Sequence, residues 1–189
     1  MRELTSTENM MKAISFDNAF TIEECNEIIK LEGNSLNEAS VYIQNKVKNY
    51  NHNLYPKAID IKPDKSNMWI SQRLEKLFMK ANQEVFNFDI RCMSGLRLNR
   101  YERNTSFDWH VDMSNGGEGS LRKLTMIVML SDPNTYGGGI LGWKAFNQTM
   151  SQKQGSAIVF PCYLVHNVTT VTHGTRYSLV CMAMGPHFK

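Results

Sequence analysis

The chain has 189 residues, with 21 Lys and Arg against 18 Asp and Glu for a formal net charge of +3, and 42% of its residues are hydrophobic. These proportions exclude a disordered chain, and 12 Gly and 5 Pro exclude a collagen-like one. Four cysteines without a C-x-x-C pair argue against a disulfide scaffold and indicate free thiols in a reducing compartment.

No part of the sequence points to a membrane or to secretion. The opening residues lack an apolar core of signal-peptide length, and no run approaches the ~18 apolar residues of a membrane span. We therefore expect a cytoplasmic protein without a membrane partner. Basic residues are spread over both halves of the chain, so charge gives no support to a nucleic-acid partner. The sequence predicts nothing about the oligomeric state.

Residues 1 to about 90 are expected to be mainly helical, after one opening strand over residues 11–16. Thr21 is a candidate N-cap, and Glu24 three residues later completes a capping-box pattern. Apolar residues at helical spacing follow, so the pattern predicts a helix that ends at Gly33.

A second helix is predicted over residues 37–47, and a third over residues 67–86, where apolar residues again recur with a helical period. Between them, residues 49–66 are polar and contain Pro56 and Pro63, which predicts a long loop. Loops of that length are often functional, so this segment is a candidate lid over a substrate.

After residue 90 the hydrophobic period changes from helical to alternating, and turn residues recur at short intervals. Strands are predicted over residues 94–101, 107–111, 123–130, 140–143, 155–160, 165–172 and 176–184. Many short strands at even spacing favour a jelly roll. We therefore predict an α+β fold, a single domain over residues 1–189 in which a helical support region (1–90) packs on a jelly-roll (double-stranded β-helix) core (91–189).

His110 and Asp112 stand two residues apart on a predicted strand, where side chains at that spacing share a face. One imidazole and one carboxylate can bind the same cation, and His166 is a candidate third ligand. Two histidines and one carboxylate that leave positions open are typical of non-haem Fe(II) oxygenases. By itself the pair is a weak signal, because a structural histidine paired with an aspartate gives the same pattern.

Arg176 follows His166 by ten residues and precedes an apolar run over residues 179–182. Its planar guanidinium can bind a carboxylate through two parallel hydrogen bonds. A dicarboxylate co-substrate with one end on a metal needs such a cation for its far end. The alternative is an arginine in a surface salt bridge, which the apolar flank disfavours.

With these features together, residues 94–184 resemble the catalytic core of the Fe(II)/2-oxoglutarate-dependent dioxygenases, in particular the prolyl-4-hydroxylase-like group. The segments that carry the resemblance are YERNTSFDWHVD (101–112), RKLTMIVML (122–130), YGGGIL (136–141), GSAIVFP (155–161), HNV (166–168) and TRYSL (175–179). Their order and spacing fit the family over about half the chain.

The resemblance implies three Fe(II) ligands, namely His110, Asp112 and His166. It implies that Arg176 holds the distal carboxylate of 2-oxoglutarate, and Tyr101 matches a position whose hydroxyl commonly helps to hold that co-substrate. Thr125 and Ser178 are candidates to line the same pocket, with ordinary strand packing as the alternative. The implied cofactors are Fe(II), 2-oxoglutarate and O₂, with ascorbate as a further candidate.

The implied reaction is hydroxylation of an unactivated C–H bond with release of succinate and CO₂, and the expected substrate is a proline in a protein or peptide. A free amino acid or another small molecule is the alternative substrate. Oxidative demethylation of nucleic acid is disfavoured, because residues 180–184 lack the second arginine of that group. A non-catalytic jelly-roll binding module is disfavoured by the intact ligand set.

Two departures from the prolyl-hydroxylase pattern concern the substrate. Asn104 and Phe107 stand where many relatives carry Gly and Tyr, and residues 181–184 lack the Trp that many relatives keep. Trp109 and Trp143 are candidates for an aromatic wall beside a proline ring, with core packing as the alternative. The glycine-rich segment 113–122 is a second candidate lid.

Overall fold

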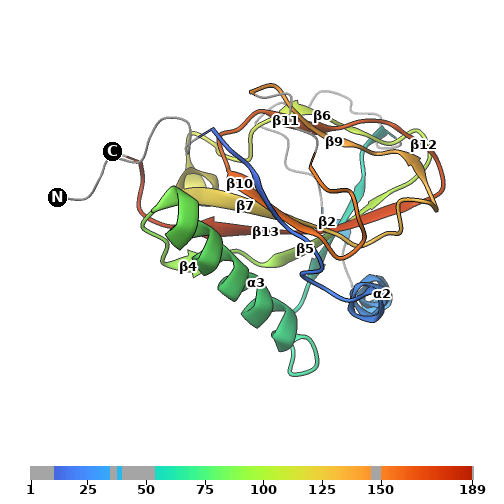
Figure 1. Ribbon diagram of the computed structural model, residues 1–189, viewed down its shortest axis with the longest axis horizontal. Helices are drawn as coiled ribbons and strands as arrows, with labels where there is room; N and C mark the ends of the chain where they lie inside the picture. The colour runs from blue at the N-terminus through green and yellow to red at the C-terminus, as the bar shows by residue number, and fades with distance from the viewer. Residues whose placement is uncertain (1–10, 35–37, 40–53, 146–149, 189) are drawn as a thin grey trace.

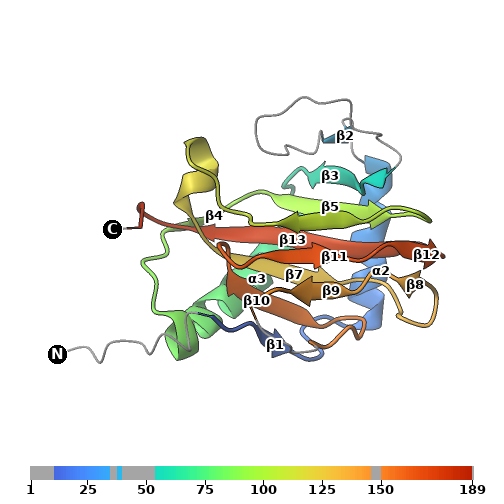
Figure 2. The same cartoon turned by 90° about the horizontal axis from the view of Figure 1, so that it is seen from above.

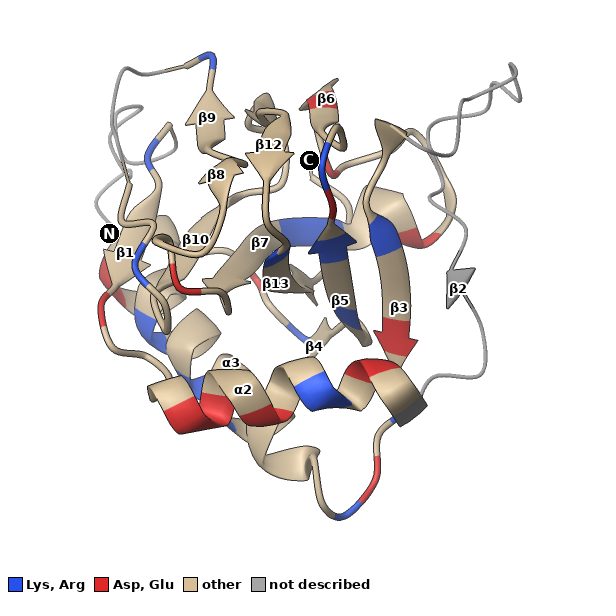
Figure 3. Cartoon of the chain, turned by 90° about the vertical axis from the view of Figure 1, so that its right-hand side faces the viewer, with Lys and Arg blue, Asp and Glu red and all other residues tan. Residues whose placement is uncertain are grey.

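The computed structural model describes residues 11–34, 38–39, 54–145 and 150–188. It has three layers, with a large antiparallel sheet in the middle, a small sheet on one face and helices on the other (Figure 1, Figure 3). This arrangement confirms the predicted α+β class, with a jelly roll of two facing sheets and a helical layer from the N-terminal half of the chain.

The large sheet contains both the central and the edge strands of the fold. Its order is β1 (Ile14–Phe16), β10 (Ala157–Pro161), β7 (Arg122–Met129), β13 (Arg176–Met184), β5 (Leu96–Tyr101), β3 (Lys57–Ile61) and β2 (Glu38–Ala39), with β4 (Cys92–Met93) paired to β13. The strands β7 and β13 lie at its centre and are almost completely buried, so both of their faces need apolar or paired side chains.

The small sheet has the order β6 (Phe107–His110), β11 (His166–Val168) and β9 (Leu141–Trp143). A two-stranded ribbon of β8 (Gly137–Gly138) and β12 (Val171–His173) continues this layer (Figure 2). His166 pairs directly with His110 across β11 and β6. The small sheet therefore brings together two residues that are 56 positions apart in the sequence.

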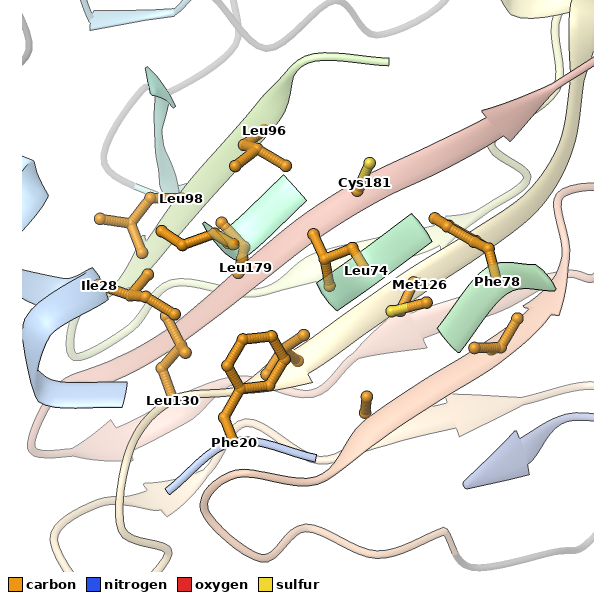
Figure 4. Packing of buried hydrophobic residues seen from close by; sticks show 14 of the residues in the cluster. Phe20, Ile28, Leu74, Phe78, Leu96, Leu98, Met126, Leu130, Leu179 and Cys181 are labelled. Atoms are coloured by element: carbon orange, nitrogen blue, oxygen red, sulfur yellow. The ribbon is translucent and has the colours of Figure 1, made fainter. Parts of the chain in front are cut away.

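The helical layer consists of α2 (Ile22–Lys30) and α3 (Met68–Ala81), which continues as a π-helix over Asn82–Phe86. The predicted capping box is confirmed, because the backbone N–H of Glu24 donates to Thr21 Oγ1 at 3.2 Å and that of Thr21 donates to Glu24 Oε2 at 2.8 Å. The buried faces of both helices pack on the large sheet, where Ile28, Leu74 and Phe78 contact one hydrophobic cluster (Figure 4).

Two hydrophobic clusters divide the molecule, and alternation along the strands decides which cluster a residue joins. On β7, Leu124, Met126 and Val128 belong to the cluster under the helices, whereas Ile127 and Met129 belong to the cluster between the two sheets. By the same alternation, the side chains of Thr125 on β7, Ser178 on β13 and Tyr101 on β5 lie on the inner face, between the sheets. The candidate site is therefore inside the jelly roll.

The N-terminal half differs from the prediction at the segment 49–66, which is not one long loop. Residues Lys57–Ile61 form β3, which pairs with β5 in the large sheet. Pro56 and Pro63 flank this strand and do not interrupt it, and a proline is compatible with a strand end. The helix predicted over 37–47 lies mostly outside the described residues, and its described part, Glu38–Ala39, is a strand paired with β3.

In the C-terminal half the predicted strand over 165–172 is two strands, β11 and β12, which belong to different sheets. Thr169 and Thr170 are both exposed, so the alternation breaks between them and the chain changes partners there. The predicted strand over 107–111 ends at His110, so Asp112 lies beyond the strand and not on it. The remaining predicted strands lie within three residues of the observed ones.

Candidate active site

Two side chains of the small sheet, His110 and His166, meet Asp112, which lies just past the end of β6. The Nε2 atom of His110 lies 3.6 Å from Asp112 Oδ1, and the Nε2 atom of His166 lies 3.6 Å from Asp112 Oδ2. All three ligand atoms lie within 4.8 Å of one another, close enough to bind a single metal ion. Within the described residues, this is the cluster of His, Cys, Asp and Glu side chains that has such geometry.

Both imidazoles are held in the orientation that a metal ligand needs. Nδ1 of His110 lies 2.7 Å from the carbonyl oxygen of Asp108, and Nδ1 of His166 lies 2.9 Å from that of Leu164. A carbonyl can only accept a hydrogen bond, so each Nδ1 carries the proton and each Nε2 keeps its lone pair. Backbone carbonyls that fix the far nitrogen are common behind metal-binding histidines.

Asp112 is fixed by contacts from β7 and from the turn after β10, because it lies past the end of β6. Its backbone N–H donates to the carbonyl of Cys162 at 2.9 Å, and its own carbonyl accepts from Arg122 Nη1 at 2.8 Å. Its carboxylate accepts a hydrogen bond from Thr125 Oγ1 at 2.6 Å. These contacts replace the strand geometry that the sequence analysis assumed for this residue.

Charge and burial shift the pKa of the Asp112 carboxylate in opposite directions. Burial raises the pKa of Asp112, but the neighbouring His166 and His110 and the Thr125 hydroxyl outweigh it and hold the pKa well below its usual range. For His166, burial lowers the pKa more than the nearby Asp112 carboxylate raises it. At neutral pH the cluster is therefore an anionic carboxylate beside a neutral His166, which are the forms that bind metals.

Arg176 is 1% exposed, and its guanidinium forms no ion pair with any carboxylate among the described residues. It donates to Ser178 Oγ and lies near Met129 Sδ, both at 3.3 Å, while its Nε has no partner. A buried and unpaired guanidinium is costly unless a bound anion compensates for it.

Tyr101 connects Arg176 to the three-residue cluster. It is Arg176's direct cross-strand neighbour on β5, and the guanidinium lies 5.0 Å from the centre of its ring. Burial raises the pKa of Tyr101 to about 12, while Arg176 lowers it and Asp112 raises it. This phenol is therefore within electrostatic range of both the cation and the carboxylate.

The sequence analysis missed Gly139, although the run of three glycines was a signal for a special backbone. Gly139 has φ +62°, and a Cβ built on it would lie 2.7 Å from Arg176 Cδ. The absence of a side chain here leaves space for the stem of Arg176. Arg122 was also missed, because nothing in the sequence distinguishes an arginine at the start of a strand.

The aromatic residues around the site divide into buried and exposed ones. Trp143 belongs to the cluster between the sheets, where it packs edge-on against Phe160, so it is a core residue. Trp109 is 42% exposed, with Lys144 Nζ 5.1 Å from its ring centre. Phe107 packs against His110 with ring centres 4.0 Å apart.

The candidate lids remain predictions, although part of the second one is ordered. Within the segment 113–122, Gly117–Leu121 form a short 3-10 helix.

A hollow of about 520 Å³ lies beside the start of α2 and the loop after β7, and none of its lining residues belongs to the three-residue cluster.

The comparisons with known proteins agree with this geometry. Residues 96–183 match the family model described as the 2OG-Fe(II) oxygenase superfamily. The chain is therefore similar to the 2OG-Fe(II) oxygenase superfamily over this segment. The matched segment includes His110, Asp112, His166 and Arg176. The superfamily implies Fe(II), 2-oxoglutarate and O₂ as cofactor and co-substrates.

The chain is also similar to a PKHD-type hydroxylase from Prochlorococcus marinus, with 32% identity over 125 residues, which cover 63% of this chain and 51% of that protein. The chain thus spans about half the length of this curated relative. The fold is similar to a viral collagen prolyl hydroxylase from Paramecium bursaria Chlorella virus-1, with TM-score 0.68, 13% identity, and 92% and 96% of the two chains covered. It is also similar to a Trichoplax adhaerens prolyl hydroxylase solved with a hypoxia-inducible-factor peptide fragment, with TM-score 0.70, 14% identity, and 95% and 86% covered.

The residues of this chain fit the implied groups on two observations. Three donor atoms of the kinds that Fe(II) accepts converge within 4.8 Å, and the guanidinium of Arg176, whose Nε has no partner, has the geometry to bind a carboxylate. Among the described residues, no helix is both long enough and apolar enough to cross a membrane.

Proposed function

We propose that this chain is an Fe(II)- and 2-oxoglutarate-dependent dioxygenase that hydroxylates an unactivated C–H bond of a peptidyl proline and releases succinate and CO₂. His110, Asp112 and His166 bind the iron, and Arg176 binds the distal carboxylate of 2-oxoglutarate. Residues 1–189 act together as one catalytic domain, with the helical layer as support for the jelly roll.

The observation that carries the proposal is the buried, unpaired Arg176 in the same inner layer as the three-residue cluster. A metal centre alone would not need this cation. Arg176 and Asp112 of the three-residue cluster both shift the pKa of Tyr101, which supports an anion-binding group and a cation-binding group that serve one ligand. A dicarboxylate that also binds metal is the co-substrate that this pair selects.

The chain's own residues bind and orient the metal and the co-substrate, and they exclude water from the site. The two backbone carbonyls behind the histidines keep both Nε2 lone pairs directed at the metal position, and Arg176 with Ser178 sets the position of the co-substrate's far end. The iron, when bound, supplies the oxidising power for C–H cleavage. The apolar residues between the sheets, Ile127, Met129, Leu141, Phe160 and Val180, keep bulk water away from the pocket.

The assignment of a substrate class is supported more by the related proteins than by the residues of the site. Structural neighbours are prolyl hydroxylases, one of them solved with a peptide, which supports a peptide substrate for this chain. Trp109 precedes His110 on β6 and is exposed, so by strand alternation it points away from the cluster and does not support a wall beside a proline ring.

The test is to incubate the purified chain with Fe(II), 2-oxoglutarate, O₂ and a library of proline-containing peptides. We expect succinate, together with peptides heavier by one oxygen atom on proline. His110→Ala should abolish both products, whereas His187→Ala, which changes an exposed histidine outside the cluster, should not. Turnover of a free amino acid with unchanged peptides would contradict the peptidyl-proline assignment, and no succinate with any substrate would contradict the oxygenase assignment.

A further inference from the structure

The hydrogen bond between Thr125 and Asp112 has a consequence for metal binding that goes beyond the ligand set. Asp112 lies past the end of β6, so no strand pairing fixes its side chain. Its backbone is anchored by Cys162 and Arg122, but these contacts leave the carboxylate free to rotate. The contact that fixes the carboxylate itself is the one from Thr125 Oγ1 to Oδ2, at 2.6 Å.

Thr125 is suited to be a fixed donor. It lies in the interior of β7, paired with Phe160 of β10 on one side and with Met182 of β13 on the other, and is 1% exposed. A β-branched side chain in a central strand has few rotamers to choose from. A hydroxyl that donates to an ionised carboxylate at this distance forms a strong, charge-assisted hydrogen bond.

The hydrogen bond from Thr125 makes the two carboxylate oxygens of Asp112 chemically different. Oδ2 receives the Thr125 proton and lies 3.6 Å from His166 Nε2, while Oδ1 lies 3.6 Å from His110 Nε2 and receives no hydroxyl hydrogen bond. Because a hydroxyl has one proton to donate, the proton of Thr125 is already used and is not available to the co-substrate. This argues against Thr125 as a direct donor to 2-oxoglutarate, although its position in the sequence makes it a candidate to line the co-substrate pocket.

We propose that Thr125 is a positioning residue for the metal centre, which holds the Asp112 carboxylate directed at the metal position between His110 and His166. The inference rests on the proposed function, because it assigns the three-residue cluster to a metal. Hydrogen bonds from residues behind the ligands typically change metal affinity by about 10–100-fold. The chain therefore uses β7, a strand with no metal ligand, to complete the metal site.

The experiment measures Mn(II) binding to the metal-free chain by calorimetry, without O₂ and without turnover. Thr125→Val keeps the shape of the side chain but removes the donor, and we expect the Kd for Mn(II) to rise by about 10–100-fold. Thr125→Ser keeps the donor and should bind Mn(II) with an affinity close to that of the wild type. Thermal unfolding of each metal-free variant shows whether it folds.

Thr105→Val is the matched control. Thr105 is also buried, at 6% exposure, and its hydroxyl donates to the backbone carbonyl of Glu102 at 2.7 Å, away from the cluster. This variant should lower the unfolding temperature and leave the Kd for Mn(II) unchanged. Equal Mn(II) affinity in Thr125→Val and the wild type would overturn the positioning role, as would a loss in Thr125→Ser or Thr105→Val as large as that in Thr125→Val. Absence of Mn(II) binding in the wild type would contradict the proposed function itself.

Discussion

At the scale of single residues, Arg176 is the residue that most clearly indicates a ligand-binding site. Its guanidinium is buried with a hydroxyl, a thioether and an aromatic ring as neighbours. A cation over an aromatic ring gains up to ~2 kcal/mol, whereas the effective penalty for burying an ion is several kcal/mol. The free energy of the ligand-free chain is therefore raised at this position.

Arg176→Met should separate stability from binding. We expect the free energy of unfolding of the ligand-free chain to stay the same or rise, because an uncompensated charge is removed. Affinity for 2-oxoglutarate should fall by about 2 kcal/mol or more, roughly 30-fold, because its distal carboxylate loses its partner. Denaturant melts and calorimetric titration with 2-oxoglutarate measure the two effects, and strong destabilisation with unchanged binding would show that Arg176 is a structural residue.

A pH dependence follows from His166. Burial lowers its pKa in the folded chain, so below the ordinary value of about 6.5 the unfolded chain takes up the proton more readily. The free energy of unfolding of the metal-free chain should therefore fall as the pH drops from about 6.5 toward 5, by at most ~1.4 kcal/mol per pH unit. The corresponding contribution of Asp112, whose pKa is also lowered, is lost only at more acidic pH.

Denaturant melts of the metal-free chain at several pH values measure this effect. His166→Asn removes the titrating ring, so its stability should depend less on pH in that window. Equal slopes for the wild type and His166→Asn would contradict a neutral, buried His166.

At the scale of elements, the turn between β8 and β9 controls the arginine on β13. Gly139 combines a positive φ with close approach to the Arg176 side chain. A side chain at this position would be strained by its backbone and would displace the stem of the guanidinium.

Gly139→Ala should therefore weaken 2-oxoglutarate binding and also lower stability, by about 1 kcal/mol or more for the positive φ alone. Gly95→Ala is the control, because a Cβ there meets no atom within 4 Å. Calorimetric titration with 2-oxoglutarate and thermal melts of both variants check this. A Gly139→Ala variant with wild-type co-substrate affinity would show that the turn does not position Arg176.

Element prediction from the sequence worked where one local signal was sufficient. The capping box at Thr21 set the start of α2, and strand alternation set β13 at Arg176–Met184. It failed where pairing between distant segments decides the structure. Lys57–Ile61 is a strand because β5 offers it an edge, and Asp112 joins the two histidines because Cys162 and Thr125 hold it. Neither partner is visible in the local sequence.

At the scale of the whole molecule, the two hydrophobic clusters have different roles, one in stability and one at the site. The cluster under the helices packs α2 and α3 on the large sheet, and the other cluster lies between the two sheets, in the same layer as the site. Changes in the helical layer should therefore alter stability without altering ligand affinity, as expected for distant sites.

Thr21→Ala tests this division. Loss of the N-cap should lower the free energy of unfolding by about 1 kcal/mol, while the affinities for Mn(II) and 2-oxoglutarate stay unchanged. Thermal melts and calorimetric titrations on the same sample measure both quantities. A matching loss of Mn(II) affinity would mean that the helical layer and the site are coupled.

His110, Asp112 and His166 are proposed to bind Fe(II) at a site that also binds 2-oxoglutarate. Anaerobic addition of both to the metal-free chain, followed by visible spectroscopy, tests this proposal most directly. We predict a weak charge-transfer band in the wild type that is absent in His110→Ala. A wild-type chain without the band, or a His110→Ala chain with the same band, would contradict the assignment of this site.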